Sequence, residues 1–185
     1  EYIEGLSLKK WASLNVNSKM SQNLIRNGIK AIIYMMFDYG VFHGDPHPGN
    51  IIISNQNTIN FIDFGIIGKF SKSTKQIIFE YYLYLMQNNY LKAAQSIIQI
   101  SEQTKKSNKN DFIQEILNIS KKWSASNFSE YSFGHLILEF IKIASKYGFN
   151  FPVDVFLMSR ALITIEAVGY LLDKNIDIIQ LSRPI

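Results

Sequence analysis

The spacing of apolar residues predicts a chain that is mostly helical. Between residues 20 and 39, apolar side chains recur every three or four positions, which is the repeat of one helix face. The same repeat predicts further helices over residues 8–14, 73–86, 90–100, 111–123, 133–147 and 153–172. Ser7, Ser73 and Asp111 stand at the expected N-caps, and Gly40 and Gly148 stand at expected helix ends.

Two short apolar runs stand apart from this helical repeat. Residues 51–53 and 59–62 are apolar, and the sequence Asn55-Gln56-Asn57 between them favours a turn. We therefore predict one β-hairpin within an α+β fold that is mainly α.

A rigid polar loop precedes the predicted hairpin. The chain reads His43-Gly44-Asp45-Pro46-His47-Pro48-Gly49-Asn50 there, and Asp63-Phe64-Gly65 follows thirteen residues after Asn50. Proline and glycine prevent a regular helix or strand from forming, so Asp45 and Asn50 are expected on a loop. Asp63 ends the second apolar run, and Gly65 is expected to release the backbone from regular structure. One arm of the hairpin therefore ends at Asn50 and the other at Asp63.

This set of polar residues fits phosphoryl transfer, with ATP and Mg²⁺ as the implied cofactors. Mg²⁺ takes oxygen ligands, often one or two carboxylates together with phosphates and water. Asn50 and Asp63 are the candidate metal ligands, and Asp45 is the candidate catalytic group that orients or deprotonates a hydroxyl or water. The alternative explanation is three polar turn residues without a chemical role, and the two motifs in register disfavour it.

The run from His43 to Asn50 resembles the signature of the UbiB-type atypical kinases, the ubiquinone-biosynthesis kinase-like family. Glu1-Tyr2-Ile3-Glu4-Gly5 resembles that family's hinge between lobes, and residues 160–166 resemble its C-terminal helix. The resemblance implies the C-terminal lobe of a protein-kinase-like fold, in which the hairpin carries the catalytic and metal loops. It implies nucleotide or phosphate binding by Glu1, Tyr2, Ile3 and His47, and structural roles for His43 and Gly65.

Some individual roles stay open within this resemblance. His47 either contacts phosphate or braces the loop, whereas His43 fits a packed structural residue better than a catalytic base. Arg160 and Glu166 either have a functional role, because the resemblance includes them, or form a buried ion pair that locks the last helix, and the ion pair is the preferred interpretation.

The domain organisation follows from the same resemblance. We expect residues 1–185 to form a single kinase-like lobe, with the hinge at 1–5, the catalytic and metal loops at 41–65 and a helical region at 73–172. The chain does not begin with Met and opens at the predicted hinge, so the N-terminal lobe is expected to be absent from it. Without that lobe's phosphate-binding Lys, the chain alone is expected to bind ATP weakly and to show little turnover.

The sequence departs from protein kinases after Gly65. Only about ten residues separate Gly65 from the next helical pattern, which is an ordinary short connection rather than a long activation loop. Gly44 also stands where an Arg would pair with a phosphorylated activation loop. A small molecule, a lipid or water is therefore the expected phosphate acceptor, rather than a folded protein.

Composition and charge add a few constraints. A hydrophobic content of 47% and a charged content of 18% fit a folded globular chain, and the absence of Cys excludes disulfides and thiolate metal sites. A net charge of +4 is too small to indicate nucleic acid as a partner. No run reaches the roughly 18 apolar residues of a membrane span, so no transmembrane segment is predicted. The resemblance implies a peripheral location on the cytoplasmic side of a bacterial or organellar membrane, with ubiquinone-pathway proteins as partners.

Two alternatives to an atypical kinase or ATPase remain. Aminoglycoside- and choline-type phosphotransferases have a similar loop, although Pro46 and the hinge favour the UbiB-type family. A non-catalytic pseudokinase that serves as a binding module has no evident reason to retain Asp45, Asn50 and Asp63 together.

Overall fold

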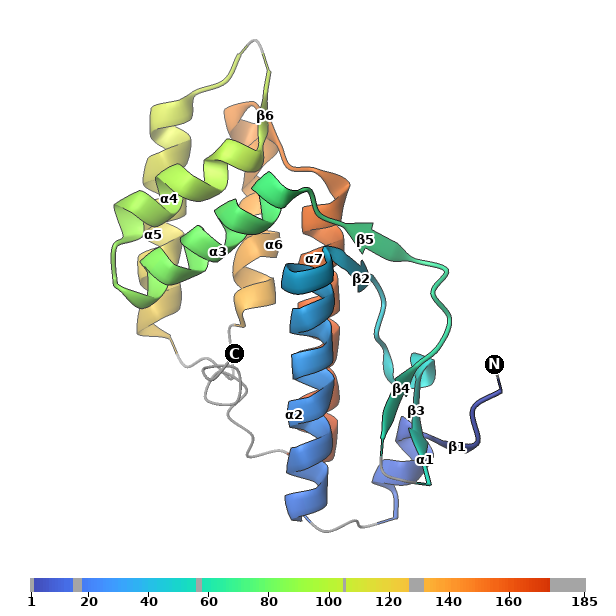
Figure 1. Cartoon of the computed structure of the whole chain (residues 1–185). Helices are drawn as coiled ribbons and strands as arrows, with labels where there is room; N and C mark the ends of the chain where they lie inside the picture. Colours follow the sequence, from blue (N-terminus) through green and yellow to red (C-terminus); the bar gives the residue numbers. More distant parts are fainter. Residues whose placement is uncertain (1, 15–17, 56–57, 105, 127–131, 174–185) are drawn as a thin grey trace. The chain divides into compact units, whose positions relative to one another are not determined.

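The computed structural model describes the chain except for residue 1 and residues 15–17, 56–57, 105, 127–131 and 174–185. The chain divides into two compact units (Figure 1). The first unit contains residues 1–68 and the chain from Arg160 onward, and the second contains Lys69–Ser159. The described residues are mainly helical, with three small sheets, which agrees with the predicted α+β class. The single kinase-like lobe over residues 1–185 stays a prediction.

The first unit contains a three-stranded antiparallel sheet. Strands β3 (Ile51–Ser54) and β4 (Ile59–Phe61) pair with each other, as the two apolar runs predict. Ile51 and Ile53 are buried, because alternate residues of a strand share one face. Strand β1 (Gly5–Ser7) pairs with the other edge of β3, an arrangement that the apolar pattern did not predict.

Helix α1 (Leu8–Ala12) follows β1 directly. Ser7 stands at the N-cap position of this helix as predicted, but its side chain makes no capping hydrogen bond. Packing stabilises this short helix instead, since Leu8 and Trp11 are both buried.

Helix α2 (Ser18–Tyr34) carries the predicted apolar face. The buried residues on this face are Leu24, Ile25, Ile29, Ile32 and, in the following turn, Met36. The prediction of one uniform helix to residue 39 is corrected at its end, where Met35–Tyr39 form a π-helical turn. Gly40 ends the helix as predicted, with a left-handed φ of 70°.

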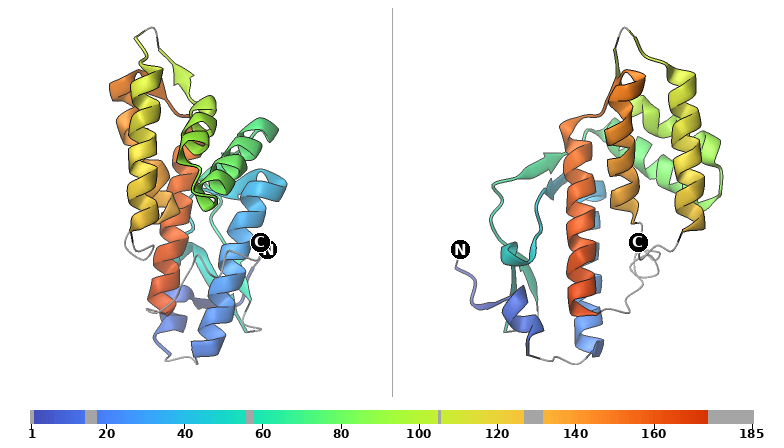
Figure 2. Two further views of the ribbon diagram at one scale, coloured as in Figure 1. Left: turned by 90° about the vertical axis from the view of Figure 1, so that its left-hand side faces the viewer. Right: turned by 180° about the vertical axis from the view of Figure 1, so that it is seen from behind.

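The long helix α7 (Val153–Leu172) begins in the second unit and continues into the first. Its part from Arg160 onward lies beside α2 in both Figure 1 and Figure 2. Gly28 of α2 lies close to the hairpin and to α7: a Cβ at that position would lie 2.9 Å from Cδ1 of Ile59 in β4 and in ordinary contact, 3.7 Å, with Cδ1 of Ile165 in α7. The hairpin, α2 and α7 therefore share one core.

The second unit is helical. Its helices are α3 (Lys72–Met86), α4 (Tyr90–Ile97), α5 (Lys109–Ala125), α6 (Phe133–Ala144) and the start of α7, with 3₁₀ turns at Ile98–Ile100 and Ser145–Tyr147. Its two-stranded sheet pairs β6 (Glu102–Gln103) with β7 (Phe149–Asn150). Large aromatic side chains, including Tyr81, Phe112, Trp123 and Phe140, are buried in its core.

Two predicted N-caps in this unit are corrected. Ser71, rather than Ser73, caps α3, because its hydroxyl oxygen accepts a hydrogen bond from the backbone N–H of Thr74. Asn108, rather than Asp111, caps α5 through the backbone N–H of Asp111. Several polar residues cluster at both helix starts, so the sequence alone places the cap only within two or three positions.

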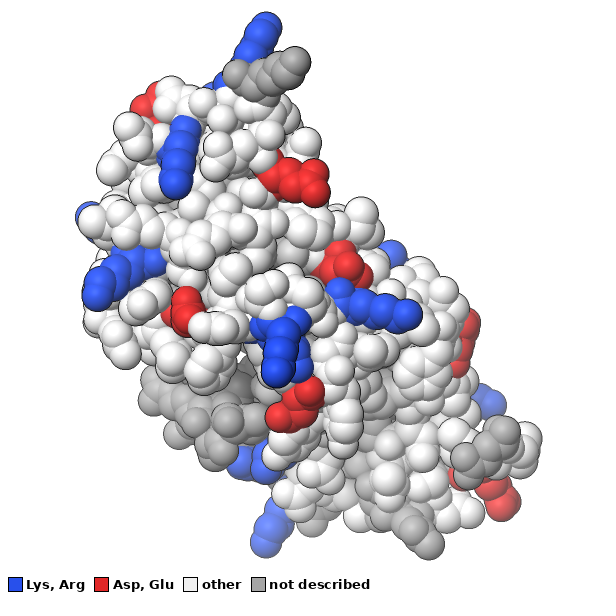
Figure 3. Space-filling view, turned by 45° about the horizontal axis from the view of Figure 1, so that its top comes forward, with Lys and Arg blue, Asp and Glu red and all other residues white. Residues whose placement is uncertain are grey.

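Helix α7 is the one helix among the described residues that is long and apolar enough to cross a membrane. The core helix of a soluble protein passes the same test, and α7 buries Val155, Met158, Ala161, Ile165 and Val168 inside the protein. On the face in Figure 3, Lys and Arg side chains lie scattered over mainly uncharged surface, some of them next to Asp or Glu.

Candidate active site

Two loops in the first unit contain the residues singled out in the sequence. Strand β2 (Val41–His43) leads into the first loop, residues 44–50, which ends in a 3₁₀ turn at Pro48–Asn50. The second loop, residues 62–66, leaves β4 and enters β5 (Ile67–Lys69). Because β2 pairs with β5 and β3 pairs with β4, both loops are held at each end by a strand pair.

The two loops are also joined directly through their backbones. The N–H of Gly44 donates to the carbonyl oxygen of Ile66 at 2.9 Å, and the N–H of Ile62 donates to the carbonyl oxygen of Asn50 at 2.9 Å. Gly44 allows the first contact, because a Cβ there would lie 2.7 Å from Cγ2 of Ile66. The second contact places Asp63, the next residue after Ile62, beside Asn50.

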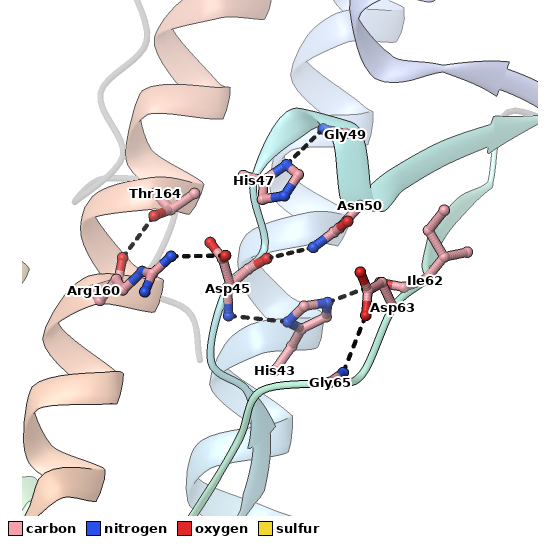
Figure 4. Close-up of polar contacts among 10 residues, drawn as sticks. All are labelled: His43, Asp45, His47, Gly49, Asn50, Ile62, Asp63, Gly65, Arg160 and Thr164. Atoms are coloured by element: carbon pink, nitrogen blue, oxygen red, sulfur yellow. Dashed lines mark hydrogen bonds and ion pairs between the residues drawn. The ribbon is translucent and has the colours of Figure 1, made fainter.

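The imidazole of His43 connects the two loops a third time (Figure 4). The backbone N–H of Asp45 donates to Nδ1 at 3.1 Å, so Nδ1 is an acceptor and Nε2 donates to the carbonyl oxygen of Ile62 at 3.0 Å. The ring is fully buried and lies against Phe61 and Phe64, at centroid distances of 5.9 and 4.9 Å. These are the contacts of a residue that braces both loops.

The carboxylate of Asp45 is turned toward helix α7. Its Oδ2 accepts a hydrogen bond and ion pair from Nη2 of Arg160 at 2.7 Å. In Figure 4 this carboxylate faces α7, whereas Asn50 and Asp63 lie on the other side of the loop. The backbone carbonyl of Asp45, rather than its carboxylate, contacts Asn50.

The side chains of Asn50 and Asp63 each leave one oxygen available. Nδ2 of Asn50 donates to the carbonyl oxygen of Asp45 at 3.1 Å, which leaves its Oδ1 as a spare acceptor. Oδ1 of Asp63 accepts from the N–H of Gly65 at 3.2 Å, and its Oδ2 has no protein partner among the described residues. Asn50 is buried and Asp63 is exposed. The pair therefore lies at the protein surface, with Asn50 on its inner side.

The backbone at the second loop has its unusual conformation at Asp63 and not at Gly65. Asp63 has φ of 57°, a left-handed conformation that is uncommon for residues other than glycine. Gly65 lies in a turn, outside regular structure, and its φ is not positive. Left-handed non-glycine residues concentrate at functional sites, where the surrounding structure holds them.

The structure also shows the positions of the other predicted site residues. His47 is exposed, and its Nδ1 accepts from the N–H of Gly49 at 3.0 Å, so it caps the 3₁₀ turn. Tyr2 is highly exposed and Ile3 partly exposed, in a segment without regular structure that precedes β1. Glu1 lies outside the described residues.

Two family models match this chain. The model of the ABC1 atypical kinase-like domain matches residues 1–97, which is more than half of the 185 residues, and the model of the UbiB helical domain matches residues 114–177. The chain belongs to the ABC1/UbiB family of atypical kinase-like proteins. The resemblance of the motif at residues 43–50 is thereby confirmed, and the family connects the chain to kinase-like proteins of ubiquinone biosynthesis.

The donor set of this ABC1/UbiB chain fits Mg²⁺. Both spare atoms, Oδ1 of Asn50 and Oδ2 of Asp63, are oxygens of the kind that Mg²⁺ prefers, and one of them carries charge. The described residues contain no group of three or more His, Cys, Asp or Glu side chains that could hold a metal ion. A metal at this site would therefore take its remaining ligands from phosphate oxygens and water.

Arg160 is the site residue that the sequence prediction placed wrongly. The predicted buried ion pair with Glu166 is corrected: the Arg160 salt bridge goes to Asp45, and the Arg160 side chain is 44% exposed. Residues six apart on a helix do not share a face, so the predicted pair had poor geometry from the start. The available signal was that Arg160 is the one basic residue in the largely apolar helix Val153–Leu172, because a charged residue in such a helix usually has a specific partner.

Proposed function

We propose that this chain carries the catalytic and metal loops of an ATP-dependent atypical kinase or ATPase that acts in ubiquinone biosynthesis. The observation that supports this most strongly is the connection of two loops through His43 and two backbone hydrogen bonds. These contacts hold the backbones of the two loops close together, which supports a common role of Asp45, Asn50 and Asp63 in phosphoryl transfer.

In this proposal Asn50 and Asp63 hold Mg²⁺. Bound Mg²⁺ supplies positive charge against the phosphate oxygens of ATP. The chain's contribution is to present the amide oxygen of Asn50 and the carboxylate of Asp63 without rearrangement, because both side chains are already oriented by hydrogen bonds. His47 and the hinge residues Tyr2 and Ile3, with Glu1, are the proposed contacts to the nucleotide.

Asp45 is the proposed catalytic residue. Its carboxylate orients the hydroxyl of the acceptor, or a water molecule, and accepts that group's proton as the new bond to phosphorus forms and the bond to ADP breaks. The Asp45 side chain is 19% exposed, so a substrate approaching from solvent can reach it. Hydrogen bonds to the side chains of His43 and Asn50 fix the backbone of Asp45 and so limit the positions that its carboxylate can take.

A small molecule or a lipid is the proposed acceptor, with water as the acceptor in an ATPase. Strand β5 begins two residues after Gly65 and α3 begins at Lys72, so the chain returns to regular structure at once. A protein substrate normally docks on a long segment at this place in protein kinases. We further propose peripheral binding to the cytoplasmic side of a membrane, where lipid acceptors are found.

The proposal is tested with the full-length protein that contains these residues. ADP release is measured with ATP and a Mg²⁺ titration for the wild type and for Asp45→Asn and Asp63→Asn. Asp45→Asn is expected to lower turnover by about 10²- to 10⁴-fold, because the proton acceptor is lost. Asp63→Asn is expected to raise the Mg²⁺ concentration that gives half-maximal activity, because one charged ligand is lost.

The control is Asp111→Asn, which removes a carboxylate near the start of α5 in the second unit. This variant is expected to keep wild-type turnover. If the wild type binds Mg-ATP but Asp45→Asn turns over equally fast, the catalytic proposal fails and the fold serves as a binding module.

A further inference from the structure

The contact between Arg160 and Asp45 joins residues 115 positions apart in the sequence. We propose that Arg160 is a positioning residue for Asp45: it holds Oδ2 of the carboxylate so that Oδ1 faces the acceptor. This inference rests on the proposed function, because it gives Arg160 a role only if Asp45 takes part in the reaction.

The backbone of Asp45 is fixed before Arg160 is considered. Its N–H donates to Nδ1 of His43 at 3.1 Å, and its carbonyl oxygen accepts from the N–H of His47 at 2.8 Å and from Nδ2 of Asn50 at 3.1 Å. These bonds leave only the two side-chain torsions of Asp45 free. A carboxylate with free torsions would present its oxygens in several directions.

Arg160 removes that freedom. Nη2 lies 2.7 Å from Oδ2, and Oδ1 has no hydrogen-bond partner among the described residues. One oxygen is therefore held and the other is left to accept a proton. Catalytic groups need such orientation, because small displacements from the productive geometry are costly in rate.

The position of Arg160 is itself well defined. It lies on α7, whose residues Ala161, Ile165 and Val168 are buried in the protein. The hydroxyl of Thr164 donates to the backbone carbonyl oxygen of Arg160 at 2.8 Å (Figure 4). A guanidinium presented by a packed helix is a more precise support than one on a loop.

The solvent exposure of the ion pair between Arg160 and Asp45 favours a positioning role over a stabilising one. The Arg160 side chain is 44% exposed and the Asp45 side chain 19% exposed. Ion pairs that water reaches this easily contribute little to folding stability. The effect of the pair is therefore expected in the geometry of Asp45 and hence in the rate of the chemical step.

The test compares Arg160→Gln and Arg160→Lys with the wild type in the full-length protein. Arg160→Gln is expected to lower kcat about 10- to 100-fold while the KM for ATP changes less than about twofold, because orientation is lost and nucleotide contacts are not. Arg160→Lys is expected to recover part of the rate, since an ammonium can still reach the carboxylate. A third variant, Arg160→Ala, tests chemical rescue. Added methylguanidinium, which replaces the missing guanidinium group, is expected to raise the kcat of this variant.

The matched control is Arg26→Gln, which removes the same charge from α2 in the same unit. It is expected to keep the wild-type kcat and KM. Thermal unfolding of each variant identifies any that does not fold. If Arg160→Gln is unfolded, the kcat and KM of Arg160→Lys are compared with those of the wild type instead.

The outcomes separate the two proposals. An active wild type with an unchanged kcat in Arg160→Gln overturns the positioning role alone. A higher kcat in Arg160→Gln also overturns it, because Arg160 would then be blocking Asp45. A wild type without Mg-ATP-dependent turnover overturns the proposed function, and the positioning role with it.

Discussion

At the scale of single residues, His43 is the residue on which the arrangement of the site depends most. Its two ring nitrogens bind one backbone group from each loop, and the ring is enclosed by Phe61 and Phe64. Removing the imidazole would leave the N–H of Asp45 and the carbonyl of Ile62 without these partners. A buried polar group without a partner is more costly than the lost hydrogen bond alone.

We predict that His43→Ala lowers the free energy of unfolding by about 2–4 kcal/mol, from the cavity and the unpaired backbone groups. Urea unfolding of the chain measures this change. His135→Ala, which removes an exposed imidazole from α6, is the control and is expected to stay within about 0.5 kcal/mol of the wild type. Equal effects of the two substitutions would show that His43 does not brace the loops.

At the scale of elements, helix ends follow local hydrogen bonds that the apolar repeat does not reveal. The hydroxyl of Ser71 caps α3 and lies 2.8 Å from the hydroxyls of both Ser73 and Thr74. Both Ser71 and Ser73 have the right chemistry for a cap. The direction of the chain leaving β5 decides between them, because the cap must stand where the backbone is still extended, as it is at Ser71.

The corrected cap makes a prediction about α3. Ser71→Ala is expected to destabilise the protein by about 1 kcal/mol, because the N–H of Thr74 loses its acceptor. Ser73→Ala is the matched control, since it removes a hydroxyl from the first turn without removing the cap, and it is expected to cost less than about 0.5 kcal/mol. Chemical denaturation measures the free energy of unfolding of both variants. A larger decrease for Ser73→Ala than for Ser71→Ala would show that Ser73 is the cap of α3.

At the scale of the whole molecule, the compact units and the family models divide the chain differently. The ABC1 model extends to residue 97 and so includes α3, which belongs to the second unit. The UbiB helical model spans residues 114–177 and so includes the part of α7 that packs in the first unit. Helix α7 therefore contributes to both cores, and its Arg160 lies at the start of the part that contacts the site.

The stability of the whole chain is predicted to fall at high pH because of Tyr81. Burial raises the pKa of Tyr81 well above its ordinary value of 10.0. Above pH 10 the unfolded chain releases this proton while the folded chain keeps it, so the free energy of unfolding decreases as the pH rises. The slope from this group approaches about 1.4 kcal/mol per pH unit.

Tyr81→Phe removes this contribution. Urea unfolding at a series of pH values is expected to show a weaker decline above pH 10 for Tyr81→Phe than for the wild type. Tyr39→Phe, at a position 80% exposed, is the control and is expected to keep the wild-type decline. Identical pH profiles for the wild type and Tyr81→Phe would contradict the prediction.

The sequence by itself determined the features that depend on near neighbours. The bounds of α7, the stops at Gly40 and Gly148, and the pairing of the two hairpin strands were all predictable. Each follows from the repeat of apolar residues or from the backbone freedom of glycine. The loop motif likewise indicated the candidate site residues Asp45, Asn50 and Asp63, because residue types and their spacing are local features of the sequence.

Only the tertiary structure decided which distant groups meet. The addition of β1 to β3 and the ion pair between Arg160 and Asp45 join segments far apart in the chain. The left-handed backbone of Asp63 likewise depends on how the second loop is attached to the first. Such contacts leave no periodic signal, because they arise when separate faces of already formed elements pack against each other.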